Sequence, residues 1–178
     1  TQEELNRQMI KAADNRDTKT VRKMLEQGAD PNSRDKYGYT ALIEACRWGH
    51  TDIARLLLEH EADPNVQNNY GKTALMYACR NGEPEMIQML LDAKVDLYVQ
   101  DNYGETALME ACQYGRTDTA SLLLEHGADP NVQNNYSNTA LMKACRSGHT
   151  DIARLLLEHG ADPNVQNTDG ETALTAAC

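Results

Sequence analysis

Apolar side chains recur along the chain in pairs of short runs that polar segments separate. In residues 35–67 the first run is Leu42, Ile43, Ala45 and Cys46, and the second is Ile53, Leu56 and Leu57. Each spacing places its apolar side chains on one face of a helix. Thr40 precedes the first run as an N-cap, and Gly49 stands where that run ends. The pattern therefore predicts two short helices joined by a turn, the second beginning around residues 50–52.

The polar segments around these runs carry turn and loop signals. Residues 35–38 read Asp-Lys-Tyr-Gly, in which the Asp side chain accepts local backbone hydrogen bonds and the Gly permits a positive φ. After the second run comes Ala-Asp-Pro-Asn from Ala62, where Pro64 disfavours helix for Asp63. Residues 35–67 are thus predicted to form a turn, a helix, a turn, a helix and an extended loop.

This pattern repeats every 33 residues without an insertion. The period is marked by Cys46, Cys79, Cys112, Cys145 and Cys178. Thr-Ala-Leu recurs from Thr40, Thr73, Thr106, Thr139 and Thr172. Ala-Asp-Pro-Asn recurs from Ala29, Ala62, Ala128 and Ala161, and residues 95–98 are its divergent copy. A fixed period of this length is typical of a solenoid, in which each copy buries its apolar face on its neighbours.

The period and motifs closely resemble the ankyrin repeat, whose Thr-Pro-Leu-His-x-Ala motif appears here as Thr-Ala-Leu variants. The resemblance implies an all-α repeat solenoid of helix-turn-helix units, with projecting β-turn or hairpin loops and a concave groove on the first-helix side. We expect one domain over residues 1–178. It comprises an N-terminal cap repeat at 1–34, full repeats at 35–67, 68–100, 101–133 and 134–166, and a partial repeat at 167–178. The chain stops inside a first helix, so we expect that it continues in its parent protein or that its last segment frays.

Two departures from the family pattern predict local differences. The motif His is replaced by Ile43, Met76, Met109, Met142 and Thr175, so the usual Thr-to-His hydrogen bond cannot form and apolar packing is expected instead. Core packing is favoured for these Met residues over a soft binding stripe. Glu61 and Lys94 occupy a helix-ending Gly position, where a left-handed residue costs on the order of 1 kcal/mol.

Charge and hydropathy narrow the possible partners. The formal charge is −10, which disfavours DNA and anionic membranes because phosphate binding depends on Lys and Arg. Residues 101–133 hold one basic and six acidic side chains, so a partner is expected to present a basic element there. No apolar run approaches the roughly 20 residues that span a bilayer, and the start has no signal-peptide pattern. We expect a cytoplasmic, monomeric protein.

The residues that could carry chemistry all have structural explanations. The cysteines are about one repeat apart, too far for disulfides, so reduced and buried thiols are expected. The five His residues fall at the Gly-His motif or before helix ends, and their spacing does not suit a metal. Neither a phosphate-binding Gly-rich loop nor a nucleophile elbow is present. The sequence therefore predicts no enzyme activity and no cofactor.

Aromatic and charged residues at the turn tips and first helices are the candidate binding surface. Phe is absent, so the core is expected to be aliphatic and most Trp and Tyr to lie outside it. Tyr, Trp and Arg dominate binding hot spots. The candidate partner-binding residues are Tyr37, Tyr39, Arg47, Trp48, Tyr70, Tyr77, Arg80, Tyr103, Glu110, Tyr114, Tyr136, Lys143 and Arg146. Tyr37, Tyr70, Tyr103 and Tyr136 recur in register, so they either bind or stack tip against tip. Trp48, Tyr77 and Tyr114 are unique to their copies and favour binding.

Three functions fit these features. The leading one is a noncatalytic protein-interaction module that recognises a protein or peptide through the groove and turn tips. The alternatives are binding of a small ligand or oligonucleotide by aromatic and Arg stacking, and a targeting or regulatory arm of a larger enzyme. The resemblance alone also implies that Asn32, Asn65, Asn131 and Asn164 match an asparagine that can be hydroxylated in such repeats.

Overall fold

The computed structural model describes residues 1–177, which form helices joined by turns and loops, with no β-strand among them. These residues divide into two compact units, an N-terminal unit over Thr1–Val95 and a C-terminal unit from Asp96 onward. The N-terminal unit contains α1 (Gln2–Asp14), α2 (Thr18–Glu26), α3 (Ala41–Trp48), α4 (Thr51–Glu59), α5 (Ala74–Asn81) and α6 (Pro84–Asp92). The C-terminal unit contains α7 (Ala107–Gln113), α8 (Thr117–Glu125), α9 (Ala140–Arg146), α10 (Thr150–Glu158) and α11 (Ala173–Ala176).

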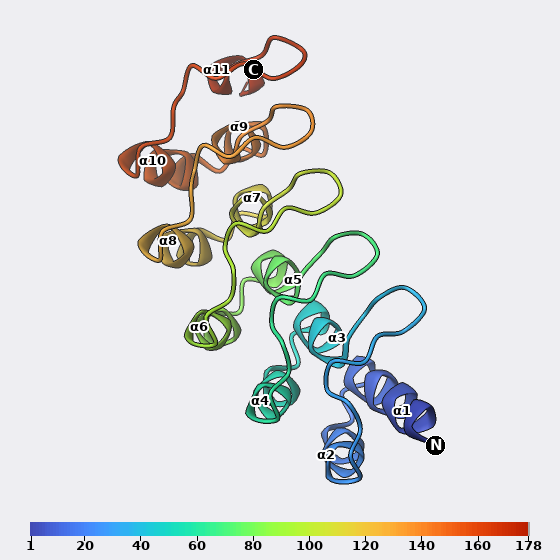
Figure 1. Cartoon of the computed structure of the whole chain (residues 1–178). Helices are drawn as coiled ribbons and strands as arrows, with labels where there is room; N and C mark the ends of the chain where they lie inside the picture. The colour runs from blue at the N-terminus through green and yellow to red at the C-terminus, as the bar shows by residue number, and fades with distance from the viewer. Residues whose placement is uncertain (178) are drawn as a thin grey trace. The chain divides into compact units, whose positions relative to one another are not determined.

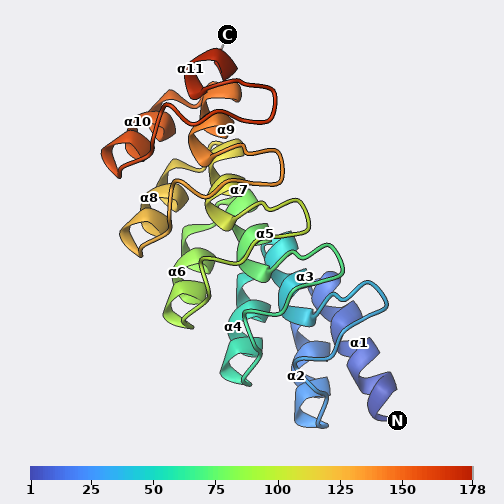
Figure 2. The same ribbon diagram turned by 45° about the horizontal axis from the view of Figure 1, so that its top comes forward.

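Each unit has two rows of helices. In the N-terminal unit α1, α3 and α5 lie side by side in a first row, α2, α4 and α6 form a second row, and loops project from the first row (Figure 1). In the C-terminal unit α7, α9 and α11 form the first row, and α8 and α10 form the second (Figure 2). The predicted all-α fold of helix-turn-helix copies with projecting turns is thereby confirmed.

The helix boundaries follow the capping residues in the sequence. The Thr40 hydroxyl accepts a hydrogen bond from the Ile43 N–H at 3.1 Å, and Thr73, Thr106, Thr139 and Thr172 cap their helices in the same way. Gly49 ends α3 in the left-handed region with φ 72°. Glu61 and Lys94 adopt φ of 62° and 57°, as predicted from their place in the repeat. Local sequence thus determines where these helices begin and end.

The core is aliphatic and sulfur-rich. Ile43, Met76, Met109 and Met142 are each 1% exposed, which confirms that apolar packing replaces the motif His. Among the cysteines, Cys46, Cys79 and Cys112 are buried free thiols. Burial raises the pKa of the Cys46 thiol and raises that of Cys112 to about 12, so both stay protonated.

The expectation of buried thiols is wrong for Cys145, which is only half-buried because α9 has the short α11 as its next first-row neighbour. Cys178 lies outside the described residues.

The projecting turns are held by the side chain that begins each of them. Asp35 Oδ1 accepts from the N–H groups of Tyr37 and Tyr39 at 2.9 and 2.8 Å. The same two bonds are made by Asn68, Asp101, Asn134 and Asn167. Each turn is therefore a rigid platform for the residue at its tip.

Side-chain amides connect successive loops within each unit. Asn131 accepts from the Asp162 N–H at 2.7 Å and donates to the Gly160 carbonyl at 3.0 Å, and Asn32 contacts Asp63 and Glu61 in the same way. Tyr98 replaces this Asn in the divergent copy, and its hydroxyl donates to the Gly127 carbonyl at 3.3 Å.

Helix α1 supplies the equivalent bonds for the first loop. Asn6 accepts from the Asp30 N–H and Gln2 donates to the Gly28 carbonyl, both at 2.8 Å.

Candidate functional site

An aromatic and arginine cluster is exposed at the end of α3. Trp48 is 53% exposed, and the Arg47 guanidinium lies 4.9 Å from the Trp48 ring centroid and 5.2 Å from that of Tyr39. This cation–π arrangement orders the long Arg47 side chain and keeps the Trp48 ring beside it. The cluster offers a large apolar ring and a positive charge at one place on the N-terminal unit.

Tyr39 and Tyr77 lie beneath this cluster and are buried, each 8% exposed. Their hydroxyls are 2.9 Å apart, and Asn68 Nδ2 donates to the Tyr77 hydroxyl at 3.2 Å. Burial is the main cause of the raised pKa of the Tyr39 hydroxyl, with the Tyr77 hydrogen bond adding to it. Most Tyr residues lie outside the core, as expected, and Tyr39 and Tyr77 are the exceptions, because the Tyr70 ring packs edge-on against Tyr39 and the two hydroxyls bond each other.

The four tyrosines at the turn tips are exposed, at 49% for Tyr37, 50% for Tyr70, 58% for Tyr103 and 55% for Tyr136. The turns are joined by their backbones: the Asn69 N–H donates to the Tyr37 carbonyl at 3.0 Å, and the Asn135 N–H donates to the Tyr103 carbonyl at 2.9 Å. Within either unit, no ring contact of the described residues joins two tips. Backbone bonds rather than ring stacking therefore stiffen the turns, and the tip rings face solvent.

In the C-terminal unit the two predicted cations are paired within the fold. Lys143 Nζ lies 2.6 Å from Glu105 Oε1, where both side chains are largely buried, and 3.1 Å from Gln113 Oε1. Arg146 Nη2 lies 2.8 Å from Glu171 Oε2. These cations are therefore poorly available to an anionic ligand.

The remaining candidates differ in exposure. Tyr114, at the C-cap of α7, is 40% exposed, whereas Glu110 is buried at 6%. Arg80 on α5 is half-buried. The structure thus gathers Arg47 and Trp48 into an exposed cluster above Tyr39 and Tyr77, and it does not unite all thirteen candidates in one site.

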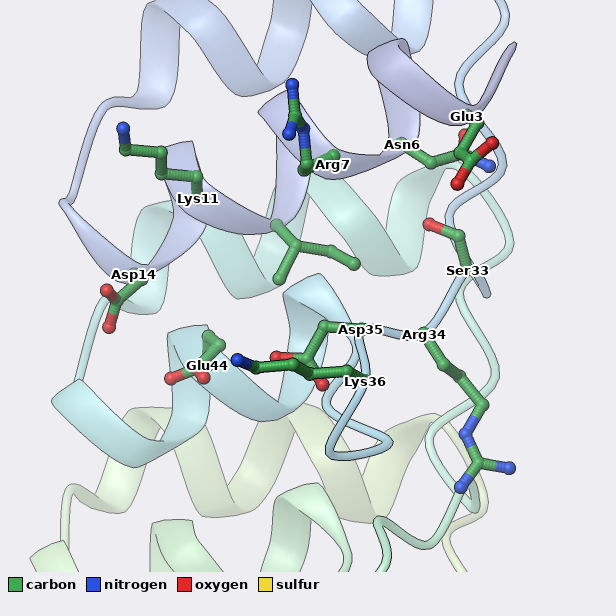
Figure 3. Close-up of a pocket in the computed structure, with 11 residues that line it drawn as sticks. Glu3, Asn6, Arg7, Lys11, Asp14, Ser33, Arg34, Asp35, Lys36 and Glu44 are labelled. Carbon is green, nitrogen blue, oxygen red and sulfur yellow. The ribbon is translucent and has the colours of Figure 1, made fainter.

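A pocket of about 510 Å³ in the N-terminal unit is lined by residues outside the thirteen candidates. It lies between α1, the segment 33–36 and α3 (Figure 3). Glu44 lines it with a side chain that is 9% exposed, and the nearest cation is Arg47 Nη1 at 3.6 Å. Burial raises the pKa of the Glu44 carboxyl. Arg47 opposes that shift, Asp14 adds to it, and a side-chain hydrogen bond from Trp48 opposes it.

The sequence does contain a signal that Glu44 differs from its counterparts in the other copies. Its helix position carries Tyr77, Glu110 and Lys143 in the other copies, which marks the position as variable. The same is true of Glu105 and Glu171, which share a turn position with Tyr39. What the sequence did not show is which of these side chains meet.

Three histidines near the ends of second-row helices contact the backbone of their own helix. Ring nitrogens of His60, His126 and His159 lie 2.8, 2.8 and 2.9 Å from carbonyls one turn earlier, which supports their structural assignment. Across residues 1–177 the His, Cys, Asp and Glu side chains form no group of three or more that could hold a metal. In that same range, no helix is long and apolar enough to cross a membrane.

Comparison with known protein families agrees with this architecture. A family model described as ankyrin repeats (three copies) matches residues 9–101, 60–134, 93–167 and 126–178 in overlapping segments. No curated protein matches the chain.

Proposed function

This chain belongs to the ankyrin repeat family, and we propose that it is a noncatalytic module that binds a partner protein or peptide through its first helices and turn tips. Members of this family generally act as protein–protein interaction modules and are typically noncatalytic. The observation that carries the proposal is the exposed Trp48 with Arg47 ordered beside it. Trp and Arg are among the residues that contribute most to binding at protein interfaces.

The exposed tyrosines extend this surface in each unit. Tyr37 and Tyr70 belong to the first-row side of the N-terminal unit, and Tyr103, Tyr114 and Tyr136 belong to that of the C-terminal unit. Tyr offers a large contact area at low conformational cost and keeps a polar group for hydrogen bonding. Tyr39 and Tyr77 support the surface from below and are not proposed to touch the partner.

Binding of an oligonucleotide finds less support than binding of a protein. The net charge is −10, and Lys143 and Arg146 are paired with Glu105 and Glu171 inside their unit. It stays a prediction that the partner presents a basic element to residues 101–133. The single domain, its division into cap, full and partial copies, and the monomeric state also stay predictions. The described free thiols fit a reducing compartment, and we propose an intracellular location.

The test is partner capture by the whole chain and by single variants. Wild-type protein serves as bait to identify a partner, and its affinity is then measured by calorimetry. We expect Trp48→Ala to weaken binding about tenfold or more, because a central exposed Trp contributes on the order of 2 kcal/mol or more. Tyr114→Ala tests the C-terminal unit. Both rings are exposed, so circular dichroism and thermal unfolding should be unchanged.

The matched control is Leu157→Ala, which removes an exposed apolar side chain from α10 in the second row. Its affinity should equal that of the wild type. Unimpaired binding by both Trp48→Ala and Tyr114→Ala would overturn the proposal. If Leu157→Ala weakened binding as much as Trp48→Ala does, the loss would be nonspecific and would also count against the proposed surface.

A further inference from the structure

The pocket of the N-terminal unit lies at an open edge of the stacked turns. In three later turns, an N–H group donates to the carbonyl of the preceding tip tyrosine, from Asn69 to Tyr37, from Asn135 to Tyr103 and from Thr168 to Tyr136. The equivalent residue of the first turn is Lys36, and its N–H has no acceptor among residues 1–177. Because α1 rather than a preceding turn lies on this side, the backbone edge at Lys36 is free to bond another chain.

Glu44 also lacks the contact with the preceding copy that Tyr77 and Lys143 make at the same helix position. Within each unit, one side chain at this position meets a residue 38 positions earlier: Tyr77 meets Tyr39, and Lys143 meets Glu105. The residue 38 positions before Glu44 is Asn6, whose side-chain oxygen accepts from the Asp30 N–H and from Gln2 Nε2. Glu44 therefore has no partner from the preceding copy.

Two buried polar atoms of the pocket have no hydrogen-bond partner, and one of them is a carboxylate acceptor. Glu44 Oε2 is buried without a hydrogen bond, in a side chain that is 9% exposed, and Ser33 Oγ is also buried without a partner. Both residues line the pocket (Figure 3). A buried carboxylate oxygen without a donor is costly, and a cationic donor relieves that cost most effectively.

The cations around the pocket do not supply this donor. Arg7 is paired with Glu4, the Arg34 guanidinium donates to the Gln67 carbonyl at 2.9 Å, and Lys36 Nζ lies 4.8 Å from the Tyr37 ring centroid. Lys11 is exposed on α1. Arg47 stays 3.6 Å from Glu44 while it stacks on Tyr39 and Trp48. Arg47 thus balances part of the Glu44 charge, and Glu44 Oε2 is left without a hydrogen-bond donor within residues 1–177.

We propose that this pocket receives a basic side chain, arginine or lysine, from an extended peptide segment of the partner. Its charged end donates to Glu44, and a carbonyl of the same segment accepts from the Lys36 N–H. The volume of about 510 Å³ accommodates one long side chain with its adjoining backbone. This inference rests on the proposed function and deepens it, because it names the chemistry of the partner.

The test is a titration of the full chain with small probes, followed through backbone amide signals by NMR. The probes are N-acetyl-arginine amide, N-acetyl-lysine amide and N-acetyl-citrulline amide, the last being a neutral analogue of arginine. We expect saturable shifts at Lys36 and Glu44 with dissociation constants on the order of 1 mM for a probe of this size. Citrulline should bind at least about tenfold more weakly, since it lacks the charge.

Saturation by either cationic probe supports the proposal, and the tighter one identifies the preferred side chain. Absence of saturable shifts with both, or equal binding of citrulline, would overturn it.

Two isosteric variants separate the pocket from general charge effects. Glu44→Gln should weaken the better cationic probe about tenfold or more, because it removes the charge and keeps the shape. The matched control is Glu59→Gln, which removes the same charge from an exposed position at the end of α4, outside the pocket. Equal losses in the two variants would contradict a specific site.

A stability measurement distinguishes a binding role from a structural one. Because burial penalises the Glu44 carboxylate, Glu44→Gln should unfold in urea at pH 7 at the same concentration as the wild type or at a higher one. A clearly lower midpoint would mark Glu44 as a structural residue and would overturn the proposal.

The outcome can be separated from that of the proposed function. If the probes do not bind while Trp48→Ala still weakens partner capture, only the pocket inference fails.

Discussion

A variable position in a repeat takes its role from the side chains that meet it. Glu44, Tyr77 and Lys143 share one helix position, yet one is a buried carboxylate, one is a buried phenol and one is an ion-paired amine. Tyr77 is buried because Tyr39 faces it with a hydroxyl, and Lys143 is paired because Glu105 faces it with a carboxylate. At this position, variability along the sequence therefore marks a change of partner within the fold.

The Tyr39–Tyr77 pair gives a test at this scale. Tyr77→Phe removes the hydroxyl that contacts Tyr39 and Asn68, and it leaves the buried Tyr39 hydroxyl without that partner. We expect a loss of about 1–3 kcal/mol in the free energy of unfolding, measured in urea.

The control for this change is Tyr103→Phe, at a turn tip that is 58% exposed, which should leave stability unchanged. Changing Tyr39 and Tyr77 to Phe together should cost less than the sum of the single changes, because no buried hydroxyl is then left unpaired. An additive loss would contradict the hydrogen bond between them.

At the scale of elements, the helix ends of this chain are set by local rules, and three of the described corners, at Arg16, Glu61 and Lys94, have a positive φ without glycine. Glu61 and Lys94 adopt the left-handed conformation that Gly28, Gly127 and Gly160 provide at the same place in other copies. A side chain at positive φ costs on the order of 1 kcal/mol relative to glycine. The corner at Glu61 is held by Asn32 of the preceding loop, which donates to the Glu61 carbonyl and accepts from the Asp63 N–H.

Glu61→Gly should therefore stabilise the chain. We expect a gain of about 0.5–1 kcal/mol in the free energy of unfolding, reduced somewhat by the greater freedom of glycine in the unfolded chain. The reverse change, Gly127→Ala, should lose a similar amount, since φ is 89° there and no atom lies within 4 Å of an added Cβ. Urea unfolding gives the free energy of unfolding of both variants. A lower value for Glu61→Gly than for the wild type would contradict the view that positive φ strains Glu61.

These local elements are the part of the structure that the sequence predicts well. The cap at Thr40, the stop at Gly49 and the left-handed Glu61 all depend on interactions within a few residues, so the 33-residue pattern reveals them. The burial of Tyr39 and the isolation of Glu44 depend on side chains 38 residues away. The sequence supplies the candidates for such contacts, but only the packed copies show which atoms meet.

At the scale of the whole molecule, the first helix of a copy buries its leucine where the second helix of that copy is present. The leucine of Thr-Ala-Leu is 1% exposed at Leu42 and Leu75 and 2% exposed at Leu108 and Leu141, whereas Leu174 is 77% exposed. The first four lie on helices that contact a second helix of the same copy. Within residues 1–177, no second helix follows α11. In a repeat protein the energy of one side chain therefore depends on which neighbours are present.

Equivalent substitutions should consequently have very different costs along the chain. Leu141→Ala should lower the free energy of unfolding by about 2–5 kcal/mol, because it leaves a cavity in a closed core. Leu174→Ala should change it by less than about 0.5 kcal/mol, since that side chain has little packing to lose. Urea unfolding compares the two, with far-ultraviolet circular dichroism to confirm that both variants retain their helices. Comparable losses would contradict the view that the second helix of a copy is what buries this leucine.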